Sequence, residues 1–175
     1  MGRIGDRQEF AKAASKRVLI AGLGLGLLAS QLIKNPKVTE IVVIEKNPDV
    51  IKLISKYLNS SKIKIIEIDY LDYLSSEIFK QQTSLVYGDT NTVSTKNPKF
   101  DYAIIDLWVA DENTSAIERQ WTIQEMKVCA GLTKLILNFT GKVWVWGLND
   151  KELNPAFYDS PELQAIKKSL INSRP

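Results

Sequence analysis

Short, largely apolar runs alternate along the chain with longer stretches in which apolar residues recur every three or four positions. The apolar runs lie at residues 18–21, 40–45, 63–68, 100–107 and 142–147. Runs of this length between turn signals are typical of strands buried on both faces of a parallel sheet. The alternation predicts an α/β protein: a Rossmann-like, mostly parallel sheet with helices on both faces and the first strand near its centre.

Helices are predicted around and between these strands. They are expected at residues 6–16, 25–34, 47–58, 69–80, 115–138 and 160–172. The clearest start is at 47–49, because Asn47 can cap free backbone amides, Pro48 suits a first helical turn and Asp49 favours the positive helix end. Residues 81–99 are polar and predict a loop insertion. We expect one domain over 1–175, with 1–16 as the lead-in helix.

Two residue counts restrict the chemistry. The 175 residues include no histidine and a single cysteine, Cys129. An intrachain disulfide, a thiolate zinc cluster, and Ser–His or Cys–His nucleophiles are thereby excluded. Cys129 lies beside the apolar stripe of the 115–138 helix, so a buried thiol is expected.

Charge and hydropathy give expectations about surroundings. The net charge of +3 does not make the dense basic stripe of a nucleic-acid-binding surface. The longest apolar stretch, around 18–29, is broken by glycines and is shorter than a membrane span. No signal peptide is evident at the start. We therefore expect a cytoplasmic protein that does not associate with membranes.

A glycine-rich turn follows the first strand directly. Its sequence is Gly22-Leu23-Gly24-Leu25-Gly26. Glycines allow a tight turn and let a ligand approach the backbone closely, and the next helix presents its amino end there. The turn predicts a nucleotide-type ligand. The register from Gly24 to Ala29 also fits a dinucleotide fingerprint, which leaves NAD as an alternative.

Acidic residues end the next three strands. Glu45 follows Gly22 by 23 residues, where a carboxylate can accept hydrogen bonds from ribose hydroxyls. Asp69 and Asp106 end the third and fourth strands. Because parallel strands end at one edge, the three carboxylates are expected to surround the glycine loop and to mark the ligand site.

Tryptophans near the strand ends have two interpretations. Trp108 comes just after the fourth strand and is the better candidate for contacting a ligand. Trp144 and Trp146 are two positions apart and share one face of the last strand. Core packing is the expected role of that pair.

Four segments together resemble a known family. The runs VLIAGLGLG, IVVIEKNPDVIKLISKYL, IKIIEIDYLDYL and FDYAIIDLW resemble class I S-adenosylmethionine-dependent methyltransferases, most closely their spermidine synthase-like branch. The resemblance covers residues 17–147. It implies a methyltransferase fold, shortened because the strand pair that usually completes the sheet is not evident. It also implies S-adenosylmethionine as cofactor and methyl transfer to an unknown acceptor, a small molecule rather than a nucleic acid.

The resemblance also implies residue roles at the cofactor. The glycine loop, with Gly22, Leu23, Gly24 and Gly26, would flank the methionine and ribose portions. Glu45 would hold the ribose hydroxyls. The adenine would lie beside Lys46, Asn47, Asp69 and Tyr70, with Asp69 at its amino group.

At the reacting end, the resemblance implies that Asp106 faces the transferred group and that Trp108 helps to wall the substrate pocket. Asp106 is the first candidate for a general base, which is needed only when the acceptor must lose a proton, and Asp111 is the second.

Two positions depart from the patterns of related families. Leu25 stands where aminopropyltransferases carry an aspartate, and Ile20 stands where many methyltransferases carry an acid. Because Leu25 argues against aminopropyl transfer, that reaction is the second interpretation and methyl transfer is the first. The missing acid at Ile20 instead supports a further alternative. A catalytically degenerate module that binds an adenosyl cofactor is the non-enzymatic alternative.

Overall fold

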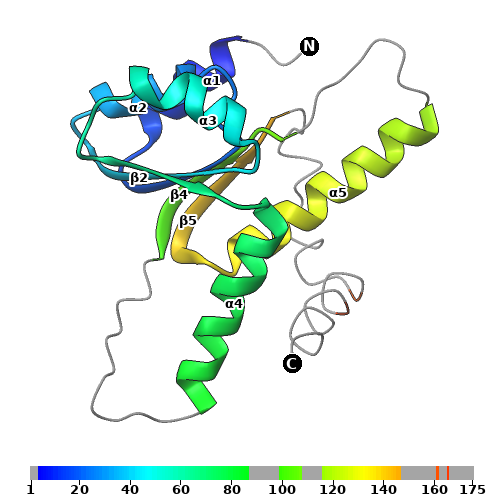
Figure 1. Cartoon of the computed structure of the whole chain (residues 1–175). Coiled ribbons are helices and arrows are strands. Elements are labelled where there is room, and N and C mark those ends of the chain that lie inside the picture. Colours follow the sequence, from blue (N-terminus) through cyan, green and yellow to red (C-terminus); the bar gives the residue numbers. More distant parts are fainter. Residues whose placement is uncertain (1–3, 87–98, 108–115, 147–160, 162–164, 166–175) are drawn as a thin grey trace.

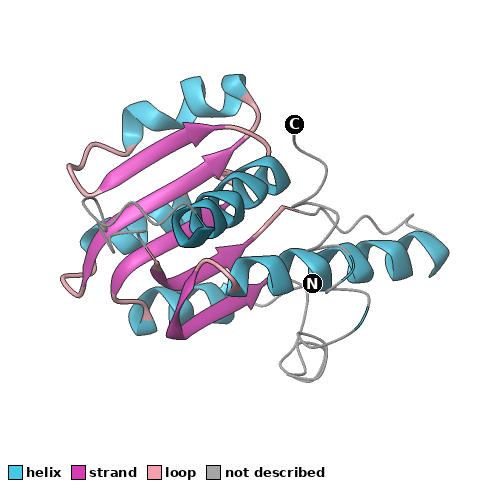
Figure 2. Ribbon diagram, turned by 90° about the horizontal axis from the view of Figure 1, so that it is seen from below, coloured by secondary structure: helices cyan, strands magenta, loops and turns pink. Residues whose placement is uncertain are grey.

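The computed structural model of the chain describes residues 4–86, 99–107 and 116–146, together with the single positions 161 and 165. A five-stranded parallel sheet lies at the centre of the described part, with the strand order β3-β2-β1-β4-β5. Figure 2 shows its arrows pointing the same way. The strands are β1 (Lys16–Ala21), β2 (Val38–Glu45), β3 (Ile63–Glu67), β4 (Phe100–Ile105) and β5 (Leu137–Val145). The predicted fold class, with β1 at the centre of the sheet, is confirmed.

Helices cover both faces of the sheet, as Figure 1 shows. One layer contains α1 (Ile4–Ala13), α2 (Leu27–Lys34), α3 (Pro48–Ile54) and the short 3-10 helix η1 (Ser55–Tyr57). The other layer contains α4 (Tyr70–Val86) and α5 (Ala116–Lys134). No helix in the described part of the chain is long and apolar enough to cross a membrane.

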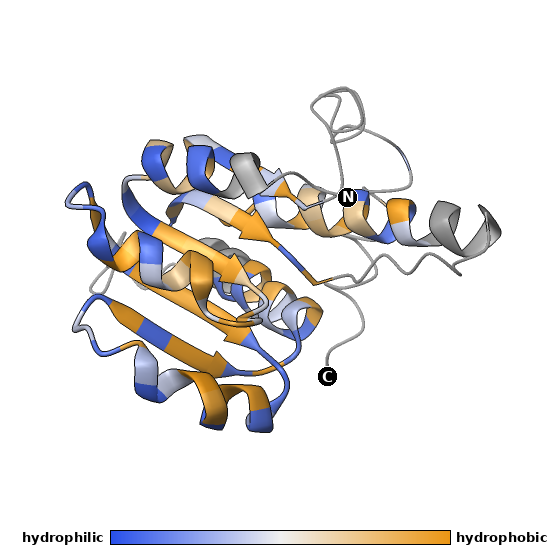
Figure 3. Cartoon of the chain, turned by 90° about the horizontal axis from the view of Figure 1, so that it is seen from above, coloured by the Kyte–Doolittle hydropathy of each residue, from blue (hydrophilic) through white to orange (hydrophobic). Residues whose placement is uncertain are grey.

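The strands separate two apolar cores because successive side chains of a strand point to opposite faces. Leu19 and Ala21 belong to the core beneath α4 and α5. Val18 and Ile20 belong to the core beneath α1, α2 and α3. Figure 3 shows apolar colouring along the strands, between the two helical layers. Burial on both faces explains why the strand sequences are continuously apolar rather than alternating.

Several predicted boundaries are wrong. The loop predicted for 81–99 begins later, because α4 continues to Val86. No glycine or proline occurs between 81 and 87, so the sequence has no strong helix breaker before Gly88. The helix predicted for 115–138 ends at Lys134, and β5 begins at Leu137 instead of residue 142. The remainder of the predicted loop, 87–98, and nearly all of the predicted helix 160–172 lie outside the described residues.

The early start of β5 accompanies an irregular register with β4. Phe100 pairs with Leu137, but Tyr102 pairs with Lys142, so β5 carries extra residues between these two pairs. Gly141 lies in this segment, where an added Cβ would come within 2.7 Å of the Leu137 Cβ. The predicted strand at 142–147 is therefore only the regular part of a longer strand.

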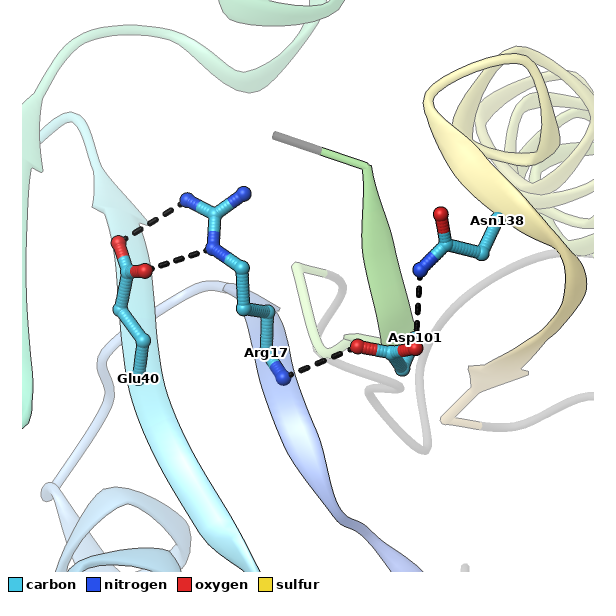
Figure 4. A network of polar contacts seen from close by, with 4 residues as sticks. All are labelled: Arg17, Glu40, Asp101 and Asn138. Carbon is cyan, nitrogen blue, oxygen red and sulfur yellow. Dashed lines mark hydrogen bonds and ion pairs between the residues drawn. The ribbon is translucent and has the colours of Figure 1, made fainter. Parts of the chain in front are cut away.

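A polar network ties the strands together near their amino ends (Figure 4). Arg17 on β1 donates from Nε and Nη2 to Glu40 on β2, at 2.6 and 3.0 Å. The Arg17 backbone amide donates to Asp101 Oδ2 on β4 at 3.1 Å. Asp101 Oδ1 accepts from Asn138 Nδ2 on β5 at 2.8 Å. Four of the five strands are thus linked through a single chain of charged and amide groups.

The Arg17–Glu40 pair makes part of the stability depend on pH. The hydrogen bond from Arg17 is the main cause that holds the pKa of Glu40 below its ordinary value of 4.5, and it outweighs the opposing effect of burial. A carboxylate with a depressed folded pKa stabilises the fold above its unfolded pKa, and this contribution is lost as the pH falls through the folded pKa. Glu40→Gln should therefore lower the free energy of unfolding at neutral pH.

The measurement is urea denaturation of wild type and Glu40→Gln between neutral pH and about pH 3. The stability difference between the two proteins should shrink once the pH falls below 4.5. A difference that stays constant over the whole range would show that the charge of Glu40 does not contribute.

Candidate functional site

Backbone hydrogen bonds bring three predicted segments to one edge of the sheet. The Gly22 amide donates to the Ile44 carbonyl at 2.9 Å, and the Asp106 amide donates to the Ala21 carbonyl at 2.9 Å. The Ile68 amide donates to the Glu45 carbonyl at 3.1 Å. The ends of β1, β2, β3 and β4 therefore meet at one level. The chain leaves β1 toward β2 on one side while β4 lies on the other, which is where open α/β sheets bind ligands.

A cavity of about 680 Å³ lies at this edge, a volume that suits a small-molecule ligand. Its walls come from the glycine loop, the ends of β2, β3 and β4, the start of α4, and α5. The lining residues are Gly22, Gly24, Ile44, Glu45, Lys46, Ile68, Asp69, Tyr70, Leu71, Asp106, Leu107, Gln124, Glu125, Val128 and Cys129. Three described residues of the predicted set do not line it: Leu23, Gly26 and Asn47. The amides of Leu23 and Asn47 donate to Glu45, and the amide of Gly26 donates to the Leu23 carbonyl.

The three loop glycines differ in the space that surrounds them. All have positive φ, at +93° for Gly22, +51° for Gly24 and +72° for Gly26. A Cβ on Gly22 would lie 2.3 Å from the Asp106 carbonyl oxygen, and one on Gly26 would lie 2.6 Å from Ile54 Cγ2. A Cβ on Gly24 would meet nothing within 4 Å. Gly22 and Gly26 thus permit close packing, while Gly24 leaves open space beside the cavity.

Glu45 connects the glycine loop to α3. Its Oε2 accepts from the Leu23 amide at 2.9 Å, and its Oε1 accepts from the Asn47 amide at 2.8 Å. Asn47 in turn caps α3, because its Oδ1 accepts from the Asp49 amide at 2.9 Å, which confirms the predicted helix start. Each carboxylate oxygen of Glu45 can accept a further hydrogen bond. The side chain is therefore fixed in place and still able to receive two donors from a ligand.

Asp69 and Lys46 lie together on the rim. Asp69 Oδ1 accepts from the Leu71 amide at 2.9 Å at the start of α4. Lys46 Nζ lies 3.8 Å from Asp69 Oδ2, and both side chains are well exposed. An exposed pair at this distance contributes little stability, so Lys46 is free to reorient around a ligand.

Tyr70 contributes to the cavity wall but not through its hydroxyl group. The residue is 4% exposed, and its hydroxyl lies 2.7 Å from Thr133 Oγ1. Since Thr133 donates its own proton to the Cys129 carbonyl, Tyr70 is the donor in this pair. Burial raises the pKa of Tyr70 well above its ordinary value. A hydroxyl that is buried and hydrogen-bonded in this way fixes α4 against α5.

Helix α5 contributes to the cavity, which was not predicted from the sequence. Gln124, Glu125, Val128 and Cys129 all line it. Gln124 and Val128 are four positions apart, as are Glu125 and Cys129, so all four residues share one face of the helix. The two polar residues beside the apolar stripe were the sequence signal that could have indicated this face. Cys129 is 4% exposed, as expected of a buried thiol. Burial raises its pKa to about 12, and the carboxylates of Glu125 and Asp69 add to that rise. The thiol is therefore protonated at neutral pH and reacts slowly.

Asp106 lies between two cavities. It lines the main cavity and also a smaller one, of about 230 Å³, between the glycine loop and α2. Gly22, Gly24 and Asp106 are the residues common to both. Asp111 and Trp108, predicted as second base and substrate wall, lie outside the described residues. Among the residues described, no group of three His, Cys, Asp or Glu could hold a metal ion.

Trp144 lies on β5 and Trp146 just after the end of that strand, with their ring centroids 5.3 Å apart. Trp144 packs against Phe10 of α1 at 6.2 Å and joins the core beneath α1, α2 and α3. Neither residue lines the main cavity. The expected packing role of Trp144 is confirmed.

Gly22 and Gly24 give a matched pair of substitutions. Gly22→Ala should strongly destabilise the fold, because its Cβ would clash with the Asp106 carbonyl and its φ suits only glycine. Gly24→Ala should cost only about 1 kcal/mol, since it has the positive φ without the clash. Thermal denaturation of both variants tests this order. Equal destabilisation would contradict the close approach at Gly22.

Comparison with known proteins places the chain among others of the same fold. Spermidine synthase from Thermotoga maritima is 16% identical, with a TM-score of 0.52 over 94% of this chain and 48% of that one. A spermidine synthase in complex with the transition-state analogue AdoDATO is 16% identical, with a TM-score of 0.51 over 94% and 47%. Precorrin 8w decarboxylase from Methanobacterium thermoautotrophicum is 14% identical, with a TM-score of 0.51 over 95% and 72%. The chain spans about half the length of these spermidine synthases.

The sequence comparison is more specific. No curated protein sequence matches the chain. The family model of the spermine/spermidine synthase domain matches residues 4–134, from α1 to the end of α5. This range contains the glycine loop and every strand-end carboxylate of the cavity. The chain therefore belongs to the spermine/spermidine synthase domain family, in agreement with the predicted resemblance to the spermidine synthase-like branch of the class I methyltransferases.

Proposed function

We propose that this transferase-family domain binds S-adenosylmethionine in the 680 Å³ cavity and transfers its methyl group to a small-molecule acceptor. The observation that carries the proposal is the position of Glu45. Its carboxylate is fixed by the Leu23 and Asn47 amides, and it lines the cavity beside the glycine loop. A carboxylate held in this way is suited to accept hydrogen bonds from both hydroxyls of a ribose.

The remaining walls suit the other parts of that cofactor. Ile68, Leu71 and Val128 offer apolar surface for a flat base. Gly24 leaves open space at the glycine loop, where a Cβ would occupy the room that a ligand needs. The ribose at Glu45 would then place the base toward α4 and α5 and the sulfur-bearing tail toward the loop and Asp106.

The charge of the lining also supports a cationic cofactor. Four carboxylates, those of Glu45, Asp69, Asp106 and Glu125, line the cavity together with one lysine, Lys46. The negative potential that they create favours a ligand with a positive charge. S-adenosylmethionine supplies a sulfonium, which is already a good leaving group, so the protein has to bind, align and exclude water.

Asp106 is proposed to act at the reacting end. The Ala21 carbonyl holds its backbone at 2.9 Å, directly beside Gly22. From there its carboxylate can position the acceptor, or take a proton from an acceptor that must lose one. Asp111 is the second candidate base and Trp108 the candidate wall of the acceptor pocket.

Aminopropyl transfer is the second candidate, and the family match favours it directly. The same cavity would then take decarboxylated S-adenosylmethionine. Leu25, the position that carries an aspartate in aminopropyltransferases, is 77% exposed and lines the smaller cavity. The nature of this side chain is the reason for placing methyl transfer first.

Calorimetric titration separates these candidates. We expect the protein to bind S-adenosylmethionine and S-adenosylhomocysteine more tightly than decarboxylated S-adenosylmethionine or NAD. Preference for the decarboxylated compound would favour aminopropyl transfer, and preference for NAD would reject the proposed cofactor. Binding without turnover across a broad acceptor screen would favour a catalytically degenerate binding module.

Glu45→Ala should weaken S-adenosylhomocysteine binding roughly ten- to a hundredfold, because two charge-assisted hydrogen bonds to the ribose are lost. The matched control is Glu67→Ala. Glu67 pairs in register with Glu45 on the neighbouring strand but does not line the cavity. Equal affinities in the two folded variants would remove Glu45 from the site.

A further inference from the structure

One carboxylate of the cavity has no role in the proposed function. Glu125 lies on α5, one turn before Cys129, and lines the cavity from the helical layer. Its side chain is exposed, and it makes no hydrogen bond or ion pair with other residues that the structure describes. It is thus an acceptor at the wall of a ligand-sized cavity whose hydrogen-bonding capacity those residues do not use.

The surroundings of Glu125 define one end of the cavity. Glu125 lies one helical turn before Cys129 on α5, and Asp69 precedes Tyr70, whose hydroxyl contacts Thr133 one turn after Cys129. The smaller cavity adjoins the main one at Gly22, Gly24 and Asp106, and none of the described residues that line it comes from α5. In the proposed binding mode, Glu125 and Asp69 belong to the same part of the wall as Val128 and Ile68, which is the part that would take the base.

Asp69 and Glu125 differ in the hydrogen bonds and ion pairs that their carboxylates make with the described residues. Asp69 Oδ1 accepts from the Leu71 amide, and its Oδ2 faces Lys46. Glu125 has no such partner among the described residues. A ligand group with two N–H donors at this end would find one partly engaged carboxylate and one carboxylate that none of the described residues engages.

We propose that Glu125 is a specificity-determining residue that accepts a hydrogen bond from the 6-amino group of the cofactor's purine. With Asp69, it makes the cavity select a 6-amino purine over a 6-oxo purine. The inference rests on the proposed function, because it requires an adenosyl cofactor with its ribose at Glu45. Ionised carboxylates only accept hydrogen bonds, so a 6-amino group satisfies them, whereas a 6-oxo group places another acceptor against them.

The test measures the affinities of S-adenosylhomocysteine and S-inosylhomocysteine by calorimetry for wild type, Glu125→Gln and Glu125→Ala. Wild type should prefer the adenosyl compound. Glu125→Ala should weaken adenosyl binding roughly tenfold, because a charge-assisted hydrogen bond is lost. Glu125→Gln should reduce the ratio of affinities for S-adenosylhomocysteine over S-inosylhomocysteine roughly tenfold, because its amide can donate to a 6-oxo group.

Glu67→Gln is the control, since it removes the same charge from an exposed residue outside the cavity and should leave the preference for the adenosyl compound unchanged.

The alkylation rate of Cys129, the chain's single cysteine, tests without any ligand whether Glu125 lies near the thiol. Loss of the Glu125 charge should speed alkylation at fixed pH, because this carboxylate contributes to the raised pKa of the thiol.

The outcomes separate the two proposals. If wild type binds neither compound, the proposed function fails and this inference fails with it. If wild type binds S-adenosylhomocysteine and both Glu125 variants keep its preference, only the inference is overturned. Equal weakening of both ligands in the variants would also overturn it, because Glu125 would then not sense the 6-position.

Discussion

The glycine loop passes the end of β4 so closely that the Gly22 backbone leaves no room for a Cβ beside the Asp106 carbonyl. The Ala21 carbonyl accepts from the Asp106 amide, and the Gly22 amide donates to the Ile44 carbonyl. These contacts hold the ends of β1, β2 and β4 at one level. The strand-end side chains of the cavity depend on that alignment. A shift of one residue in strand register would move a carboxylate to the opposite face of the sheet and away from the cavity.

Carboxylates are neutralised by a cation at one end of the sheet and are held by neutral donors at the other. At the amino ends, Arg17 satisfies Glu40 and Asp101 through side-chain and backbone donors. At the carboxyl ends, carboxylates outnumber lysines, and Glu45 is held by neutral backbone amides rather than by a cation. Neutral donors fix the geometry of Glu45 without cancelling its charge. The fold thus keeps its charge-neutralising contacts away from the edge where a cationic ligand would bind.

The sequence was sufficient for a parallel sheet with its first strand at the centre and for the edge at which the candidate site lies. Strand identity follows from buried apolar runs, and strand-end residues such as Glu45 and Asp106 follow from where those runs stop. The helix start at Pro48 was also predictable, because proline and the capping Asn47 act locally. Each of these features is set by residues that are close together in the chain.

The contribution of α5 was not predictable in the same way. Glu125 reaches the cavity because α5 packs across β4 and β5, and that packing depends on contacts between distant segments. The hydrogen bond of the Tyr70 hydroxyl was likewise not predictable, since its partner Thr133 lies 63 positions away. The length of β5 depends on an irregular pairing with β4 that no apolar run marks. Tertiary packing decides these features, and local sequence patterns do not record it.

The bridge made by Glu45 also bears on motion within the site. The Leu23 and Asn47 amide protons are held by one carboxylate, so the loop and the start of α3 share a single anchor. Any opening that frees one of these protons to exchange with solvent must move Glu45, the loop or the helix end. The exchange rates of two amides from separate segments are thus coupled through this side chain. Their joint protection is a natural measure of how firmly the binding edge is assembled.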